Sequence, residues 1–248
     1  MKRLPTLLTL ALLAATLGAQ TPDFDAILAE IDGLTTFGDG DFSAVYTIIS
    51  EVPGEEREVT QARLFRRDAN DQFLILILQP EVQRGQGYLQ VDDNVWFYDP
   101  ESRKFERTTI RENIQGSDAQ NADLDQNSFS DDYEVVDWEE DRLGNFDVWI
   151  LDLEATNSDV AYDSVKLWVR RDVTVVLKQE DYSVSGRLMR TSLYPRYERV
   201  GDKLLPRQIL IIDALNEGER TQLTMSEATT QPIPDSVFSK AYLERVNN

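Results

Sequence analysis

The sequence has 248 residues, with 25 Lys and Arg against 45 Asp and Glu, and it contains no Cys and no His. A net charge of −20 argues against binding to nucleic acid or to an anionic membrane surface, because both need clustered positive charge. The missing thiol and imidazole groups exclude Cys proteases, Ser-His-Asp triads, zinc fingers and iron–sulfur clusters. Without disulfides, the hydrophobic core must hold the fold by itself.

The N-terminal segment differs from the rest of the chain. Lys2 and Arg3 give it a positive start, residues 7–17 are nearly all apolar, and small residues end it at Ala19. This order is that of a secretory signal peptide, and the apolar run is too short to span a membrane. We expect residues 1–19 to be cleaved near Ala19, and residues 20–248 to form a single exported domain.

The next segment, residues 23–34, predicts an amphipathic helix that Asp23 caps and Gly33 ends. From Phe42 onward the period changes, and apolar and polar residues alternate as in a half-buried strand. Turn residues separate about ten or eleven such runs, which predicts a large antiparallel sheet or barrel. The predicted strands cover residues 42–48, 58–67, 73–78, 87–91, 95–98, 148–153, 164–170, 174–179, 183–193, 208–215 and 220–227.

Two further segments are not strand-like. Residues 118–131 are polar and are expected to be helical or irregular, with Leu124 and Phe129 as their large apolar residues. Near the C-terminus, Pro234 and the residues after it introduce a short helix with a plausible N-cap. No internal repeat of fixed period is found.

Residues 73–78 and 209–212 are apolar without alternation, which indicates strands buried on both faces. Such strands are typical of a sheet centre under a covering helix. The functional alternative is that one of their faces lines a cavity for an apolar ligand. Periodicity alone does not separate these two interpretations.

Carboxylates are the groups left for acid–base chemistry, and a glycosidase would need two of them about 5–10 Å apart. The runs 131–132 and 139–141 are surrounded by polar residues and predict solvated surface. Asp152 and Asp213 lie inside apolar runs, but alternation places them on the solvent side of their strands. A carboxylate glycosidase is therefore the weakest of the functional hypotheses.

An acidic loop over residues 123–134 resembles a calcium-binding template in part. Asp123, Asp125, Asn127, Asp131 and Glu134 occupy positions 1, 3, 5, 9 and 12 of the template. Position 6 should be Gly for the sharp turn, but this position is a Ser. In a chain this acidic such matches arise by chance, so no metal site is expected.

The stretch from Arg84 to residue 133 carries a family resemblance. It contains Gly87-Tyr88-Leu89, then Asp93-Asn94-Val95-Trp96-Phe97-Tyr98-Asp99-Pro100, Arg103-Lys104-Phe105-Glu106-Arg107 and Gly116-Ser117-Asp118. Leu167-Trp168-Val169, residues 182–189 and residues 194–197 continue the pattern. The chain resembles the outer-membrane lipoprotein-sorting proteins of Gram-negative periplasms, in their LolA-like branch.

This resemblance implies a mainly β (α+β) fold, a curved antiparallel half-barrel of about eleven strands with a few lid helices. The helix at 23–34 and the segment 118–131 are the expected lid. It further implies a periplasmic, non-catalytic carrier that holds acyl chains of lipoproteins or lipids in an apolar cavity, without a cofactor. Its partners would be an inner-membrane exporter or release complex as donor and an outer-membrane acceptor, and no nucleic acid.

The residues expected to line this cavity are aromatic and aliphatic side chains of the predicted strands. They are Phe42, Tyr46, Leu74, Leu76, Tyr88, Trp96, Tyr98, Trp149, Leu151, Trp168, Ile209 and Ile211. An error of one residue in register would turn each strand's set to the other face. A second hypothesis keeps the same fold but makes it an envelope-sensing module that signals to a membrane partner.

Overall fold

The computed structural model describes residues 21–91, 94–126, 128–158 and 160–246. The predicted signal peptide, Asp93 of the central motif and Asn127 of the calcium template lie outside the described residues. None of the helices in the described ranges is long and apolar enough to span a membrane.

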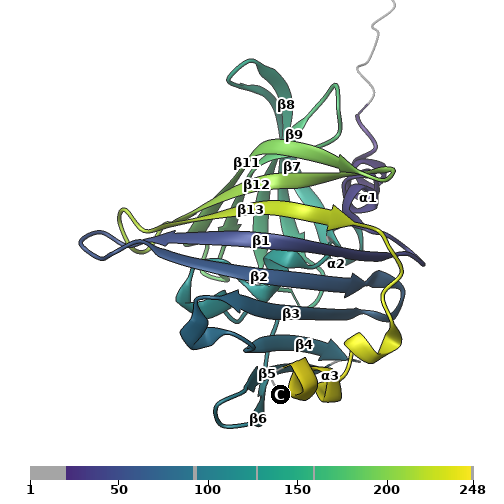
Figure 1. Cartoon of the computed structure of the whole chain (residues 1–248). Coiled ribbons are helices and arrows are strands. Elements are labelled where there is room, and N and C mark those ends of the chain that lie inside the picture. The colour runs from purple at the N-terminus through teal and green to yellow at the C-terminus, as the bar shows by residue number, and fades with distance from the viewer. Residues whose placement is uncertain (1–20, 92–93, 127, 159, 247–248) are drawn as a thin grey trace, which may run out of the picture.

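A single curved antiparallel sheet of thirteen strands dominates the described part of the chain (Figure 1). The strands are β1 (Asp41–Glu51), β2 (Glu58–Arg67), β3 (Gln72–Gln79), β4 (Gly87–Val91), β5 (Asn94–Asp99), β6 (Lys104–Thr108), β7 (Tyr133–Leu143), β8 (Phe146–Ala155), β9 (Ser164–Arg170), β10 (Val176–Tyr182), β11 (Leu188–Val200), β12 (Lys203–Asp213) and β13 (Arg220–Thr229). Their order is β6-β5-β4-β3-β2-β1-β13-β12-β11-β10-β9-β8-β7. The sheet is therefore open, with β6 and β7 at its edges.

The predicted half-barrel is confirmed, but the sheet has two more strands than the eleven expected. The additional strands are the edge strands β6 and β7. In β7, residues 137–142 are exposed on both sides of the strand, so no alternation of apolar and polar residues marks them. The acidic run 139–141 is solvent-exposed, as predicted, although it lies in a strand.

The helices are few and short: α1 (Phe24–Thr35), α2 (Phe129–Asp132) and α3 (Lys240–Val246). Five short 3-10 turns complete the described elements: η1 (Asp68–Asn70), η2 (Glu81–Gln83), η3 (Ile114–Gly116), η4 (Asn121–Leu124) and η5 (Asp235–Val237). Helix α1 begins as predicted, because the side chain of Asp23 accepts a hydrogen bond from the backbone N–H of Ala26 at 3.1 Å. Its apolar face buries Ile27, Leu28 and Ile31.

Around β3, both faces of the sheet are covered, by different elements. In β3, Phe73, Ile75 and Ile77 belong to one core cluster, whereas Leu74 packs into another cluster with Leu243 of α3. Because neighbouring residues of a strand point to opposite faces, α3 covers the face opposite to that of Ile75. Figure 1 shows α3 in front of the sheet and α2 behind it. The two-sided burial predicted for residues 73–78 is thus confirmed.

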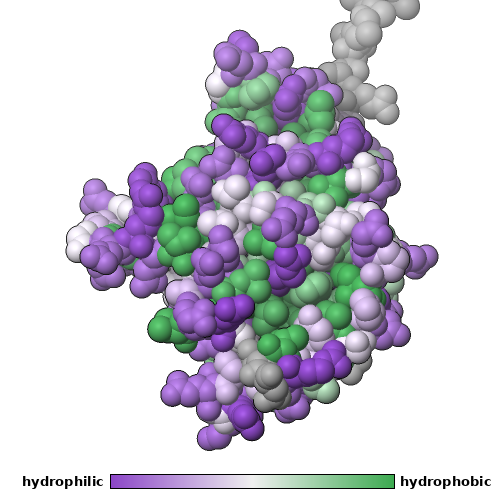
Figure 2. Space-filling model, viewed as in Figure 1, coloured by the Kyte–Doolittle hydropathy of each residue, from purple (hydrophilic) through white to green (hydrophobic). Residues whose placement is uncertain are grey.

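The outer surface mixes charged and apolar side chains. Figure 2 shows hydrophilic and hydrophobic residues interspersed across the face of the sheet turned to the viewer. The most exposed large apolar residues are Val82 (89% exposed) and Val184 (86%), which lie in turns, whereas Val136 and Trp138 are exposed within the edge strand β7. Singly exposed apolar residues of this kind are normal on a protein surface.

Candidate functional site

A cavity of about 220 Å³ lies between the concave side of the sheet and the segments α1, η4 and α2. Its apolar wall includes Ile31 and Leu34 of α1, Phe42 of β1, Phe129 of α2 and Ile209 of β12. An apolar cavity of roughly 150 Å³ already accepts a molecule of the size of benzene. This cavity therefore has room for part of an apolar ligand, but little more while it is closed.

The roof of the cavity is held together by Asp32 of α1. Its carboxylate accepts hydrogen bonds from the backbone N–H groups of Phe129 (3.0 Å) and Ser130 (2.7 Å), and from the Ser130 hydroxyl (2.8 Å). These N–H groups belong to the first turn of α2, where they have no partner within the helix. Burial raises the pKa of Asp32, and the hydrogen bonds from Ser130 and Phe129 oppose this shift.

Arg66 of β2 ties the roof to the sheet. Its guanidinium donates to the backbone oxygen of Thr35 at the end of α1, and to that of Leu124 in η4 at 3.4 Å. It is held in place by an ion pair with Asp68 (2.6 Å), and its Cζ lies 5.5 Å from the ring of Phe42. We call residues 24–35, 121–126 and 128–132 the lid, because Asp32 and Arg66 connect α1, η4 and α2 to one another and to β2.

A buried ionic cluster forms the polar wall of the cavity. Arg190 of β11 donates through Nε to Asp181 of β10 (2.7 Å) and through both Nη atoms to Asp123 of η4 (2.7 and 2.8 Å). Burial raises the pKa of Asp181, which Arg190 opposes. Burial by itself would lower the pKa of Arg190, but Asp123 and Asp181 hold it well above its usual value.

Tyrosines complete the polar wall. The hydroxyl of Tyr194 donates to the Gln179 side chain at 3.1 Å, and the hydroxyl of Tyr197 donates to the backbone oxygen of Val176 at 2.5 Å. Burial raises the pKa of Tyr46 to about 12. These phenols are neutral hydrogen-bonding groups across the physiological range, so the charges of the wall come from its Arg and Asp residues.

The structure brings three of the twelve residues expected at the cavity into its wall: Phe42, Tyr46 and Ile209. Tyr88 and Ile211 lie in the same core cluster as these three but are not among the residues that line the cavity. Leu151 lies in the core cluster beneath α1, and Trp149 packs against that cluster.

The other five predicted residues lie elsewhere. Leu74 and Tyr98 are in the cluster that contains α3, and Leu76 packs against this cluster. The Nζ atoms of two lysines lie over the two tryptophans, that of Lys240 at 3.1 Å from the Trp96 ring centroid and that of Lys178 at 3.9 Å from that of Trp168. None of the five is among the residues that line this cavity.

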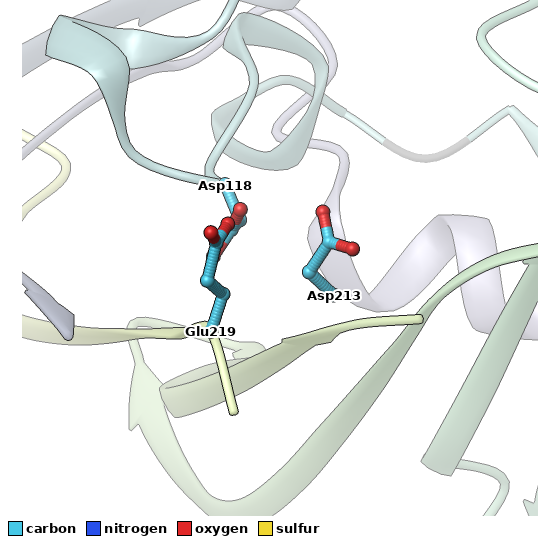
Figure 3. A group of neighbouring side chains, drawn as sticks. All are labelled: Asp118, Asp213 and Glu219. Carbon is cyan, nitrogen blue, oxygen red and sulfur yellow. The ribbon is translucent and has the colours of Figure 1, made fainter. Parts of the chain in front are cut away.

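The calcium template does not converge on a cation site in the described residues. Both carboxylate oxygens of Asp123 are bound to Arg190. The three carboxylates that do lie within 4.8 Å of one another are those of Asp118, Asp213 and Glu219 (Figure 3). Asp118 accepts from the hydroxyl of Thr221 at 2.9 Å, and Asp213 accepts from two backbone N–H groups of its own turn. Asp118 and Asp213 thus have hydrogen-bond partners within the protein, and no metal is assigned to this cluster.

Sequence reasoning missed the polar residues of the cavity. Arg66 and Asp181 lie in charged stretches of β2 and β10, and no local motif marks them as buried. The sequence marks Asp125 as a position of the calcium template, not as a residue of an apolar cavity. A usable signal is the position of Arg66 on β2. It follows Ala62 and Leu64 at a spacing of two, on the face that is buried.

Comparisons with known proteins identify one matching family model and several solved structures with a similar fold. One family model, described as "-like: Uncharacterized protein", matches residues 69–245, more than half of the chain. No curated protein matches the sequence. The structure is similar to LolA superfamily protein NE2245 from Nitrosomonas europaea, with 26% identity, a TM-score of 0.76, and coverage of 88% of this chain and 97% of that chain.

Two further solved structures show the same fold. A DUF1329 family protein from Desulfovibrio piger has 19% identity and a TM-score of 0.79. A Vibrio parahaemolyticus domain assigned to outer membrane lipoprotein sorting has 22% identity and a TM-score of 0.76. Each comparison covers 88% of this chain and 97% of the other.

Proposed function

This chain belongs to the LolA-like family, and we propose that it is a periplasmic carrier that binds acyl chains of lipoproteins or lipids in the cavity beneath its lid. The observation that carries the proposal is a cavity with an apolar wall, which the lid covers on the concave side of an open sheet. Such a cavity can admit a hydrocarbon chain when the lid moves, whereas a core that the sheet itself encloses cannot.

Several hydrogen bonds hold the lid to the rest of the protein. Arg66 of β2 donates to Thr35 and Leu124, Arg190 of β11 donates twice to Asp123, and Lys203 donates to the backbone oxygen of Gly33. Each such bond contributes about 1 kcal/mol net, and each buried methylene of a ligand contributes about 0.8 kcal/mol. The burial of an acyl chain therefore stabilises by an energy of the same order as the contacts that are lost when the lid moves.

The acidic surface fits such a carrier. A net charge of −20 keeps a loaded protein soluble and weakens its contact with anionic lipid headgroups. We propose that the donor is an inner-membrane exporter or release complex and that the acceptor lies at the outer membrane. The proposal includes no catalytic step and no cofactor.

A cavity-filling substitution tests where the ligand binds. Ala161 lines the cavity, so Ala161→Trp should displace an acyl chain, whereas Ala214→Trp at an exposed turn is the matched control. The probe is N-phenyl-1-naphthylamine, a neutral dye whose fluorescence rises in apolar sites. We expect Ala161→Trp to weaken dye binding at least about tenfold, which corresponds to the loss of about two buried methylenes. Equal binding by both folded variants would contradict a ligand site in this cavity.

Cargo is identified by lipid mass spectrometry on the protein exported in its native host and purified without detergent. Phospholipid or acylated peptide near one per protein would support the carrier. A lipid-free protein that also fails to load added lipid, and that remains bound to a solubilised membrane protein, would favour the sensing module instead.

A further inference from the structure

The cavity holds more negative than positive charge. Arg190 pairs with two carboxylates, those of Asp123 and Asp181. Arg66 pairs with Asp68 and also interacts electrostatically with Asp125. Each arginine therefore faces one carboxylate more than it neutralises. Burial raises the pKa values of Asp125 and Asp181, so the charged forms of these carboxyls are disfavoured in the cavity. A ligand that brings positive charge would stabilise the charged forms.

Asp125 is the carboxylate of this set that lacks a close partner. It accepts a hydrogen bond from the backbone N–H of Gln126 at 2.8 Å, and within the described part of the chain it forms no ion pair. A carboxylate offers about four acceptor positions, so most of its capacity is unused. Its side chain lines the cavity and is otherwise enclosed by protein. A buried polar group in this state calls for a partner that the protein itself does not provide.

The remaining walls are hydrocarbon. Phe42, Leu124, Phe129 and Ile209 line the same space as Asp125. A ligand that satisfies both parts of the cavity has an apolar chain and a cationic end. We propose that the cavity selects amphiphiles that carry an ammonium group, and that Asp125 binds this group. This inference rests on the proposed function, because it names the chemical class of the cargo in the same cavity.

Other headgroups fit this charge distribution less well. A carboxylate or phosphate end would add negative charge next to Asp125 and Asp181, and like charges in a site of low dielectric repel strongly. A hydroxyl end can donate a single neutral hydrogen bond to Asp125. Charge-assisted hydrogen bonds are about twice as strong as neutral ones. The expected order of affinity is therefore ammonium, hydroxyl, carboxylate.

Displacement of N-phenyl-1-naphthylamine by three ligands of equal chain length tests this order. The ligands are dodecylamine, dodecanol and dodecanoate, each used below its micelle concentration at about pH 7.5, where the amine is charged. We expect dodecylamine to bind about tenfold to a hundredfold more tightly than dodecanol, the range of a charge-assisted hydrogen bond. Dodecanoate should bind most weakly.

Asp125→Asn assigns the preference to one side chain. The amide has the shape of the carboxylate but no charge, so the preference for dodecylamine should disappear while the affinity for dodecanol stays the same. Asp71→Asn removes the same charge from an exposed position near Asp125 and keeps the acceptor that Gln126 uses. It should retain the preference for dodecylamine. Because Asp125→Asn removes an uncompensated buried charge, its thermal midpoint should equal or exceed that of the wild type.

The outcomes separate this inference from the proposed function. If dodecanol and dodecylamine bind equally well to the wild type, or if Asp125→Asn keeps the preference, the ammonium site is overturned and the carrier remains. If the folded wild type binds none of the ligands, both proposals are overturned.

A further comparison identifies the source of the ammonium group. Lysophosphatidylethanolamine and lysophosphatidylglycerol differ at the headgroup, and the first carries an ammonium group beside its phosphate. A preference for the first that depends on Asp125 would support a phospholipid source. A preference confined to dodecylamine would support simple amphiphilic amines.

Discussion

The carboxylate of Asp32 accepts two hydrogen bonds from Ser130, one from its backbone N–H at 2.7 Å and one from its hydroxyl at 2.8 Å. The two residues are 98 positions apart in the sequence and lie in different segments of the lid. This contact joins α1 to α2, so it holds the two segments of the lid to each other.

Asp32→Ala removes the acceptor and leaves the first N–H groups of α2 without a partner. We expect the free energy of unfolding to fall by about 1–3 kcal/mol, as for other unsatisfied buried groups. Hydrogen exchange should accelerate in residues 128–132. Glu30→Gln, at an exposed position of the same helix, is the control and should change neither quantity. Unchanged exchange in Asp32→Ala would show that α2 is held by other contacts.

Arg66→Lys keeps a positive charge beside Asp68 but loses the planar group that reaches Thr35 and Leu124 together. We expect faster hydrogen exchange at the end of α1 and in η4, with residues 129–132 less affected than in Asp32→Ala. The comparison of the two variants by mass spectrometry separates the two attachments of the lid. An exchange pattern identical in both variants would mean that the lid opens as one unit.

Stability should rise as the pH is lowered from neutral. Burial raises the pKa values of Asp32, Asp118 and Asp181. A carboxyl with a raised pKa contributes stability that is complete below its unfolded pKa and is lost as the pH rises through its folded pKa. We expect a higher thermal midpoint at about pH 5 than at about pH 8, because the contribution of these groups declines as the pH rises through their raised pKa values.

At more acidic pH the direction reverses, because the ion pair with Arg67 lowers the pKa of Asp41. Stability from that pair is lost as the pH falls through the lowered pKa. Asp118→Asn removes one of the titrating groups, so it should flatten the increase of the thermal midpoint between pH 8 and 5. The amide can still accept a hydrogen bond from Thr221, so the local structure should be kept. A midpoint that falls steadily from pH 8 to 5 in the wild type would contradict this account.

Two glycine substitutions should act in opposite directions. A Cβ atom at Gly87 would lie 2.7 Å from Cδ2 of Leu243 and 2.9 Å from the backbone oxygen of Ile75. Gly87→Ala should therefore loosen the packing of α3 and lower the free energy of unfolding by about 1–3 kcal/mol. At Gly33, inside α1, a Cβ meets nothing within 4 Å, so Gly33→Ala should stabilise by about 0.5–1 kcal/mol. Denaturant titration of both variants measures the two effects.

Trp96→Ala tests the assignment of Trp96 to the outer face of the sheet, which is the face that α3 covers. Lys240 of α3 covers the Trp96 ring, so the substitution should weaken the attachment of α3 and lower stability. Because Trp96 is not among the residues that line the cavity, the affinity for N-phenyl-1-naphthylamine should not change. A loss of dye affinity in the folded variant would place part of the ligand site on the outer face.

The sequence by itself determined most of the strands. Its alternation and turn residues predicted β2, β4 and β9 with their observed bounds. β2 and β9 are half-buried, so their apolar and polar side chains alternate with a period of two. β4 buries three residues in a row, so its bounds follow from the turn residues that flank it. The cap at Asp23 likewise located the start of α1, because capping depends on residues that are close in the chain.

Only the tertiary structure decided which face of each strand meets the cavity. β3 is apolar on both faces, so its sequence could not show that Ile75 belongs to the cluster shared with the cavity strands and Leu74 to the cluster of α3. The polar side of the site depends on distant pairs, such as Arg190 with Asp123, 67 positions apart. Whether a charged residue is solvated or buried depends on the segments that fold over it. In this chain the lid covers Arg190 and pairs with it through Asp123.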